Sequence, residues 1–336
     1  MRKLHVFFIL IILCLTMCDN QESLNPVKKT KFLLDTIVEI SIYDNDISND
    51  RADAIIDEAF SEIASYDSLY NNYNEYSFLS QVNQQAFSAA VRIDTSLHNL
   101  LSTAIMVSEQ SDGAFDVTVS PILKTWKFGR ETPVVPRDND IQKALGVTGF
   151  KHIELSDKHI RFLKKGLEID LGGIAKGYII DRAISSLIQN GVTDAMINAG
   201  GDIRAICSSL TKGKRNIWIR HPRLREKLFG RFQMDTGSIA TSGDYERFFI
   251  EDSVRYHHII DPRTGYPGNK SISVTIMAQN LMLADAYATA VFVMGPDAGL
   301  EFIENKENIE GVILYQQDDS LAYKVSTGLM NKFTTN

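Results

Sequence analysis

The stretch Glu168–Ile184 reads EIDLGGIAKGYIIDRAI and combines a short apolar segment, a glycine pair and the start of a helix. Alternation of Leu167, Ile169 and Leu171 predicts a strand that carries Asp170 near its end. A helix is expected after Gly172 and Gly173, with Lys176 in its first turns. The first N–H groups of a helix lack intrahelical partners and lie at the positive end of its dipole. The arrangement therefore predicts an anion site, to which Lys176 adds a full charge.

Two phosphate-binding motifs are excluded at this stretch. Lys176 is not preceded by the spacing of a Walker loop and is not followed by Ser or Thr. The G-x-G-x-x-G pattern of dinucleotide folds is also absent. A tight turn with an exposed lysine stays open as the alternative, so the stretch indicates a phosphate ligand without deciding it.

Composition excludes one broad class of partner. The chain has 336 residues, and its 44% hydrophobic and 23% charged residues are ordinary for a globular protein with a large core. Its net charge of -7 argues against a nucleic-acid partner, because such proteins usually carry a basic surplus. An anionic ligand would need a local positive site or a metal ion.

The N-terminus has the pattern of an export signal. Arg2 and Lys3 precede an apolar run, residues 6–15, that is too short to span a membrane. Residues 1–18 resemble a bacterial lipoprotein signal with Cys18 as the lipidated residue, although Met17 replaces the usual small residue. Plain secretion and an uncleaved anchor are the alternatives. Asp19 favours retention at the periplasmic face of the inner membrane, with residues 19–30 as a tether and residues 31–336 as one domain.

The rest of the chain predicts mixed helices and strands. Gly113–Pro121 is interpreted as a loop entering a short strand, and Thr95 as a helix cap. An antiparallel meander is expected from residues 152–155, 159–163 and 167–171. Other predicted helices cover residues 51–69, 77–83, 95–109, 141–145, 281–294 and 297–305, and other predicted strands cover 32–43, 194–197, 217–221, 229–234, 238–241, 273–277, 312–315 and 321–325.

Two polar pairs are candidates for chemistry. Asp285 and Thr289 are four residues apart in a predicted helix, so their oxygens share one face. Hard oxygen donors of this kind suit Mg²⁺, which takes few protein ligands beside phosphate and water. A threonine that bonds back to the helix carbonyl is the alternative. His257 and His258 alternate faces if their segment is a strand, so that one could be core while the other meets a ligand.

Seven ordered motifs together resemble the ApbE family of flavin transferases. The family patterns are S-x-L-S-x-L-N, G-A-F-D, D-L-G-G-x-A-K-G, N-x-G-G-D, T-S-G, H-I-I-D-P-R-T-G and A-D-A-x-A-T-A. They correspond to Ser77–Asn83, Gly113–Asp116, Asp170–Gly177, Asn198–Asp202, Thr241–Gly243, His258–Gly265 and Ala284–Ala290.

The resemblance implies an α+β fold with two mixed sheet-and-helix lobes and an FAD site between them. It also implies Mg²⁺-dependent transfer of FMN from FAD to a threonine or serine of a partner protein, with release of AMP. The partner would be an exported or membrane protein that carries a flavinylation motif. No such motif, Asp-x-x-Ser/Thr-Gly-Ala-Thr, occurs in this chain, so self-modification is not expected.

The resemblance also implies roles for individual residues. Gly173, Asp285 and Thr289 match the Mg²⁺ ligands, Gly173 through its carbonyl, and Asp285 is thereby also a catalytic residue. His258 is the candidate for proton handling. Positions that contact FAD are matched by Leu34, Tyr73, Ala114, Phe115, Asp116, Asp170, Lys176 and Ile259.

Two departures and two alternatives accompany this interpretation. The stretch between Gly129 and Pro136 is similar to the family only in composition. The family's Met-Gly-Thr stands here as Leu34-Asp35-Thr36, where Leu34 could still cover the flavin but Asp35 replaces a glycine. The first alternative is Mg²⁺-dependent hydrolysis of FAD to FMN and AMP. The second is a flavin-binding lipoprotein without turnover.

Overall fold

The computed structural model describes residues 26–128, 132–207, 215–224 and 226–336. The predicted signal, Cys18 and most of the predicted tether lie outside these ranges. Among the described helices, none has the length and apolar character needed to cross a membrane.

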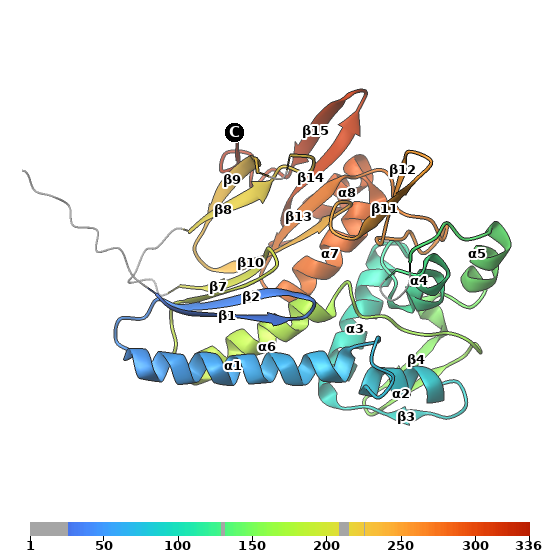
Figure 1. Ribbon diagram of the computed structural model, residues 1–336, viewed down its shortest axis with the longest axis horizontal. Coiled ribbons are helices and arrows are strands. Elements are labelled where there is room, and N and C mark those ends of the chain that lie inside the picture. Colours follow the sequence, from blue (N-terminus) through green and yellow to red (C-terminus); the bar gives the residue numbers. More distant parts are fainter. Residues whose placement is uncertain (1–25, 129–131, 208–214, 225) are drawn as a thin grey trace, which may run out of the picture.

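An eight-stranded sheet is the centre of the fold (Figure 1). All of its neighbouring strands are antiparallel, in the order β1-β2-β6-β7-β10-β13-β14-β15. The strands are β1 (Val27–Leu33), β2 (Thr36–Ile42), β6 (Ala195–Ala199), β7 (Asp202–Ile206), β10 (Gly237–Gly243), β13 (Ser273–Ala278), β14 (Glu310–Gln317) and β15 (Ser320–Val325).

Helices cover one face of this sheet. The long helix α1 (Asn49–Tyr70) packs on β1 and on α6 (Ala175–Gln189), and α6 packs on α7 (Leu281–Met294). Helix α7 lies on β10 and β13, and α8 (Pro296–Glu304) lies on β14. Because α7 is enclosed by the sheet and by α6, it is apolar on most sides rather than along one stripe.

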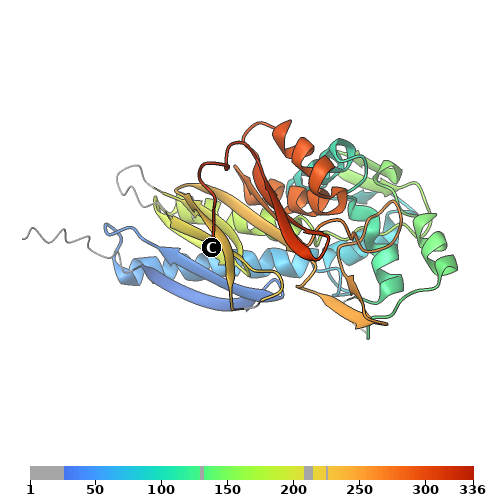
Figure 2. The same cartoon turned by 90° about the horizontal axis from the view of Figure 1, so that it is seen from above.

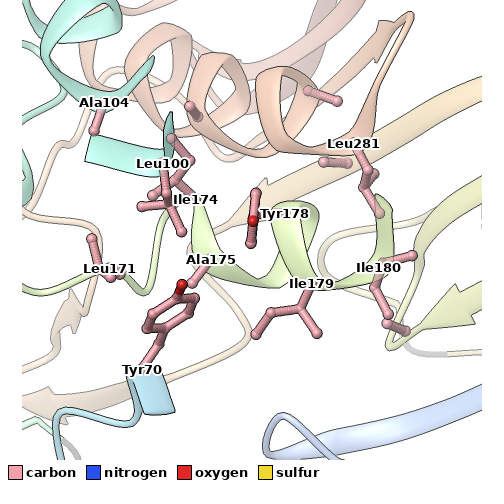
Figure 3. Close-up of a cluster of buried hydrophobic side chains, with 14 of the residues drawn as sticks. Tyr70, Leu100, Ala104, Leu171, Ile174, Ala175, Tyr178, Ile179, Ile180 and Leu281 are labelled. Atoms are coloured by element: carbon pink, nitrogen blue, oxygen red, sulfur yellow. The ribbon is translucent and has the colours of Figure 1, made fainter. Parts of the chain in front are cut away.

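A helical region lies at the other end of the molecule, on the right in Figure 1. Its buried side chains join the sheet's core without a break, and Figure 3 shows part of this junction, where Leu100 and Ala104 face Ile174. The α+β class is therefore confirmed. The region contains α2 (Phe78–Gln85), β3 (Val91–Arg92), α3 (Thr95–Gln110), η1 (Val117–Val119), α4 (Ser120–Trp126), α5 (Asp138–Leu145), η2 (Phe150–His152), β4 (Ile153–Ser156) and β5 (His159–Phe162).

The opposite face of the large sheet carries a smaller one. Strands β8 (Arg215–Arg220), β9 (Leu228–Met234) and β16 (Thr334–Thr335) bury Ile217 and Phe232 in a second core with residues of β14. A hairpin of β11 (Phe248–Glu251) and β12 (Val254–His257) projects near α4 and α5, as the view from above shows (Figure 2).

Two of the predicted strands are wrong. Residues 167–171 have no regular secondary structure and belong to no sheet, and β3 takes the expected place beside β5. The segment Gly113–Pro121 forms η1 and the start of α4 rather than a strand. The Asp116 side chain caps η1, and Pro121 stands in the first turn of α4, where the missing N–H of proline costs nothing.

The N-terminal region also differs from the prediction. Residues 32–43 were expected as one strand but contain a tight turn, where Leu34 and Asp35 have φ of 55° and 57°. Asp tolerates this left-handed backbone better than most residues, which explains how it can stand where the related pattern has glycine. Residues 27–30 of the predicted tether already belong to β1, and Asp94 rather than Thr95 caps α3.

Candidate functional site

Helices α6 and α7 cross at Gly177, close to the start of each helix. A Cβ atom at Gly177 would lie 2.3 Å from the carbonyl oxygen of Leu281, so only glycine permits this approach. The Gly177 N–H donates to Asp285 Oδ2 over 3.1 Å. Figure 3 shows Leu281 above the α6 residues Tyr178 and Ile180. The crossing thus fixes the first turn of α6 against the face of α7 that carries Asp285.

The glycine pair before α6, Gly172 and Gly173, reaches the same face of α7. Its Gly173 meets that face one helical turn after Asp285. A Cβ at Gly173 would lie 3.3 Å from Thr289 Oγ1 and 3.2 Å from Phe115 Cε2. Thr289 Oγ1 lies 3.4 Å from Ser242 Oγ of β10. The three residues predicted to hold a metal ion, Gly173, Asp285 and Thr289, are therefore brought together from segments more than a hundred residues apart.

Carboxylates dominate the charges around this point. Burial, and then the nearby Asp202, raise the pKa of Asp285 to about 7. Asp202 is itself buried, where it accepts the Thr241 N–H and forms a 2.7 Å ion pair with Lys176. Burial acts to lower the pKa of Lys176, but attraction to Asp202 and Asp285 outweighs it and raises that pKa. Lys176 is therefore a firmly protonated cation between two carboxylates.

Internal acceptors take part of the donor set at the predicted anion site at the start of α6. The Gly172 N–H donates to Asp170 Oδ1, the Ala175 N–H to the Leu171 carbonyl and the Gly177 N–H to Asp285. These internal acceptors occupy three of the donors that were expected to face a ligand. With Asp202 beside Asp285, the arrangement suits a cation better than a bare anion.

A magnesium ion fits this donor set. A buried carboxylate, a hydroxyl and a backbone carbonyl are hard oxygen ligands, and Mg²⁺ completes its shell with water and phosphate oxygens. A divalent cation would offset the cost of burying the charge of Asp285. Among the described residues, no group of three or more His, Cys, Asp or Glu side chains forms a metal cluster.

The predicted flavin positions are spread around this centre. Phe115 packs against the Gly173 backbone, and Ala114 and Ile259 are buried. Tyr73 is 38% exposed, in the connection between α1 and α2, next to a residue that bonds Asp170. Leu34 lies at the tip of the β1–β2 turn, whose neighbour Asp35 pairs with Arg247 at 3.3 Å.

The side chain of Asp116 links two segments of this fold. One of its oxygens accepts the N–H and the hydroxyl of Thr118, and the other accepts the Phe150 N–H. Burial raises the pKa of this carboxyl despite these bonds. The side chain therefore ties η1 to the segment before β4.

The two histidines do have different environments, as the sequence suggested. His257 is buried, and its Nε2 lies 2.8 Å from the Gly268 carbonyl, while its Nδ1 accepts the Ile259 N–H. His258 is half-buried, and its Nδ1 lies 3.2 Å from the Arg247 carbonyl. Burial, and then the charge of Arg247, lower the pKa of His258 to about 3. His258 is therefore neutral at physiological pH and can accept a proton.

The structure adds residues to which sequence reasoning assigned no role. Asp202 closes the motif Asn198–Asp202, and Asn83 closes the motif Ser77–Asn83. Both motifs were recognised, but nothing local shows that Asp202 pairs with Lys176 or that Asn83 bonds the backbone of Ile169.

Two surface cavities lie elsewhere. One of about 430 Å³ is lined by residues around Asp94 and His98, and one of about 680 Å³ lies between α4 and α5. Neither of these two is lined by Gly173, Asp285 or Thr289. We therefore define the candidate site by the contacts and charges of its residues, and not by either cavity.

Comparisons with known proteins agree on one family. The ApbE family model matches residues 34–313. The FAD:protein FMN transferase of Klebsiella pneumoniae is 32% identical, over 80% of this chain and 84% of its own. That of Treponema pallidum is 28% identical, over 89% of this chain and 87% of its own.

Solved structures show the same likeness in three dimensions. The ApbE protein of Thermotoga maritima has a TM-score of 0.84 and 32% identity, covering 91% of this chain and 99% of its own. The flavin transferase ApbE of Vibrio cholerae has a TM-score of 0.82 and 28% identity over the same shares. Family model, sequence relatives and fold together show that this chain belongs to the ApbE family.

Proposed function

We propose that this protein transfers the FMN part of FAD to a threonine or serine hydroxyl of an acceptor protein and releases AMP, with Mg²⁺ at Gly173, Asp285 and Thr289. The observation that carries the proposal is the contact of the Gly173 backbone with Thr289, on the helix face that also presents Asp285. Relatives of similar length carry the name FAD:protein FMN transferase.

The chemistry needs few protein groups that react covalently. When bound, Mg²⁺ would neutralise charge on the diphosphate and hold it in place. Lys176 adds a second positive charge, and Asp202 keeps the lysine side chain directed at the site. The buried Ala114, Phe115 and Ile259 provide apolar surface, while Leu34, Tyr73, Asp116 and Asp170 complete the proposed FAD contacts.

His258 is the proposed acceptor for the proton of the attacking hydroxyl. If its Nδ1–H donates to the Arg247 carbonyl, Nε2 keeps the lone pair that takes the proton. The low pKa makes the free imidazole a weak base, and an anionic diphosphate bound nearby would raise that pKa. The hydroxyl oxygen bonds to the FMN phosphorus, and the bond from that phosphorus to the AMP oxygen breaks.

A test of the proposal uses the purified domain with FAD, Mg²⁺ and a peptide that carries the flavinylation motif. We expect an FMN adduct on the peptide, detected by mass spectrometry, and an equal amount of AMP. EDTA should abolish both products. The proposal fails if neither product forms.

The same assay separates the two alternatives. AMP with free FMN and no adduct would identify a hydrolase. FAD binding without AMP would identify a binding protein, and in that case Asp285→Ala should leave the affinity for FAD nearly unchanged.

We also propose that the protein is a lipoprotein on the periplasmic face of the inner membrane. The support is the basic start, the apolar run and Cys18, followed by a polar segment before β1. Mass spectrometry of the N-terminal peptide from membranes tests this, with Cys18→Ser as the control. An unmodified Cys18 in the mature protein would contradict it.

A further inference from the structure

The segment 167–171, which belongs to no sheet, has an unusual partner. Ile169 pairs with no strand, yet its N–H donates to Asn83 Oδ1 over 2.8 Å and its carbonyl accepts from Asn83 Nδ2 over 2.9 Å. One side-chain amide thus satisfies both polar groups of a residue, as a neighbouring strand would. Asn83 lies on α2, 86 positions earlier in the sequence.

A second asparagine extends this contact to the carboxylate of Asp170. Asn83 Nδ2 also lies 3.1 Å from Asn72 Oδ1. Asn72 Nδ2 donates to Asp170 Oδ2 over 3.4 Å and to Ser120 Oγ over 3.2 Å. Each amide therefore donates twice and accepts once, which defines the orientation of both side chains.

The chain of hydrogen bonds ends at the glycine turn. Asp170 Oδ1 accepts the Gly172 N–H over 2.8 Å, and a Cβ at Gly172 would lie 2.9 Å from the same oxygen. The next residue is Gly173, whose backbone faces Thr289. Asn83, Asn72 and Asp170 thus form one polar connection from α2 to the proposed metal position.

We propose that Asn83 and Asn72 are positioning residues for the FAD and Mg²⁺ site. They hold the segment 169–173 at the distance from α7 at which the Gly173 carbonyl and Asp285 serve one cation. This inference rests on the proposed function, because it concerns the same site. Without the amides, Ile169 would need water to satisfy its backbone groups, and the turn would rely on the bond from the Asp170 N–H to the Val117 carbonyl.

The test compares Asn83→Asp with the wild type. The substitution keeps the size of the side chain but replaces its two N–H donors with an oxygen that faces the Ile169 carbonyl. We expect FAD affinity, measured by quenching of flavin fluorescence, to weaken about tenfold, as is typical for a lost buried hydrogen bond. The Mg²⁺ concentration for half-maximal AMP release should rise as well, and the thermal midpoint should fall because the Ile169 carbonyl loses its donor.

The matched control is Asn190→Asp. Asn190 is equally half-buried and also donates from its amide, to Ser186 and Glu58, but at the far end of α6. It should leave FAD affinity and Mg²⁺ dependence unchanged. A purely structural role for Asn83 would lower the thermal midpoint of the Asp variant and leave both binding readouts within twofold, and that result would overturn the inference.

Two further measurements keep the test decisive. If Asn83→Asp does not fold, Asn72→Ala takes its place, because it removes the contact to Asp170 and leaves Ile169 paired. The double variant Asn72→Ala/Asn83→Ala is compared with its two single Ala variants. Its fold-loss of FAD affinity should be smaller than the product of their fold-losses, because both residues act through one connection. Wild-type protein that binds FAD without transferring FMN would refute the proposed transferase but still permit this comparison.

Discussion

The starts of α6 and α7 make the same kind of contact for different purposes. Asp181 of α6 accepts the N–H groups of Leu281 and Met282, and the Asn280 side chain accepts that of Leu283. Asp285 of α7 accepts the Gly177 N–H at the start of α6. Each helix therefore supplies a carboxylate to the positive end of the other.

The difference lies in what surrounds each carboxylate. Both oxygens of Asp181 bind backbone N–H groups, and Arg204 lies 3.3 Å from one of them. Asp285 stands near a second buried carboxylate, Asp202, which forms an ion pair with Lys176 of α6. Asp181, whose partners all belong to the protein, stabilises the fold. Asp285 lies beside a second negative charge, so it suits the binding of a cation.

Gly177→Ala should have the largest effect, because it disrupts both helix starts at once. The added methyl group would meet the Leu281 backbone at 2.3 Å, which no rotamer change relieves. We expect a loss of more than about 3 kcal/mol in the free energy of unfolding, beyond typical overpacking. Urea denaturation measures this loss. A midpoint equal to that of the wild type would contradict the close crossing.

Asp285→Asn should separate function from stability at the α6 start. The amide oxygen can still accept the Gly177 N–H, but the charge that would hold a cation is gone. We expect FMN transfer to fall about 100-fold or more, a loss typical of removing a group that stabilises charge in the transition state. The unfolding midpoint should be retained. Transfer at the wild-type rate would exclude Asp285 as a metal ligand.

Asp181→Asn should show the opposite pattern at the α7 start. The new NH₂ group would face an N–H donor, so one helix-capping bond is lost. We expect a cost of about 2 kcal/mol in unfolding free energy, with the affinity of the folded protein for Mg²⁺ unchanged. Chemical denaturation and a Mg²⁺ titration of AMP release provide the two readouts. If Mg²⁺ affinity also fell, the two helix starts would not be functionally distinct.

The smallest effect concerns acid stability. His258 has a pKa near 3 in the folded protein, against 6.5 as its ordinary value. Between these values the unfolded chain binds more protons, so His258 lowers stability as pH falls below about 6.5. The thermal midpoint of wild type should therefore fall more steeply than that of His258→Gln between pH 7 and 5. Parallel curves for the two proteins would show that the pKa of His258 does not change on folding.

Local patterns predicted much of the fold. The helix Leu281–Met294 and the last hairpin follow the sequence closely, because their apolar spacing and terminal residues act within the segment. The predicted strand 167–171 failed for a physical reason. Its alternation is real and Ile169 and Leu171 are buried, but Ile169 bonds a side chain from α2 and the Asp170 N–H bonds the Val117 carbonyl of η1, so no neighbouring strand pairs with it.

The sequence by itself determined the residue types of the site, the order of the motifs and the pairing of Asp285 with Thr289 on one helix face. Only the tertiary structure decided that Gly173 lies against Thr289, that Asp202 holds Lys176 and that Asp285 accepts the Gly177 N–H at the α6 start. Periodicity describes which face of an element is apolar, but these contacts join segments far apart in the chain. They depend on how closely two helices can approach, and Gly177 sets that distance.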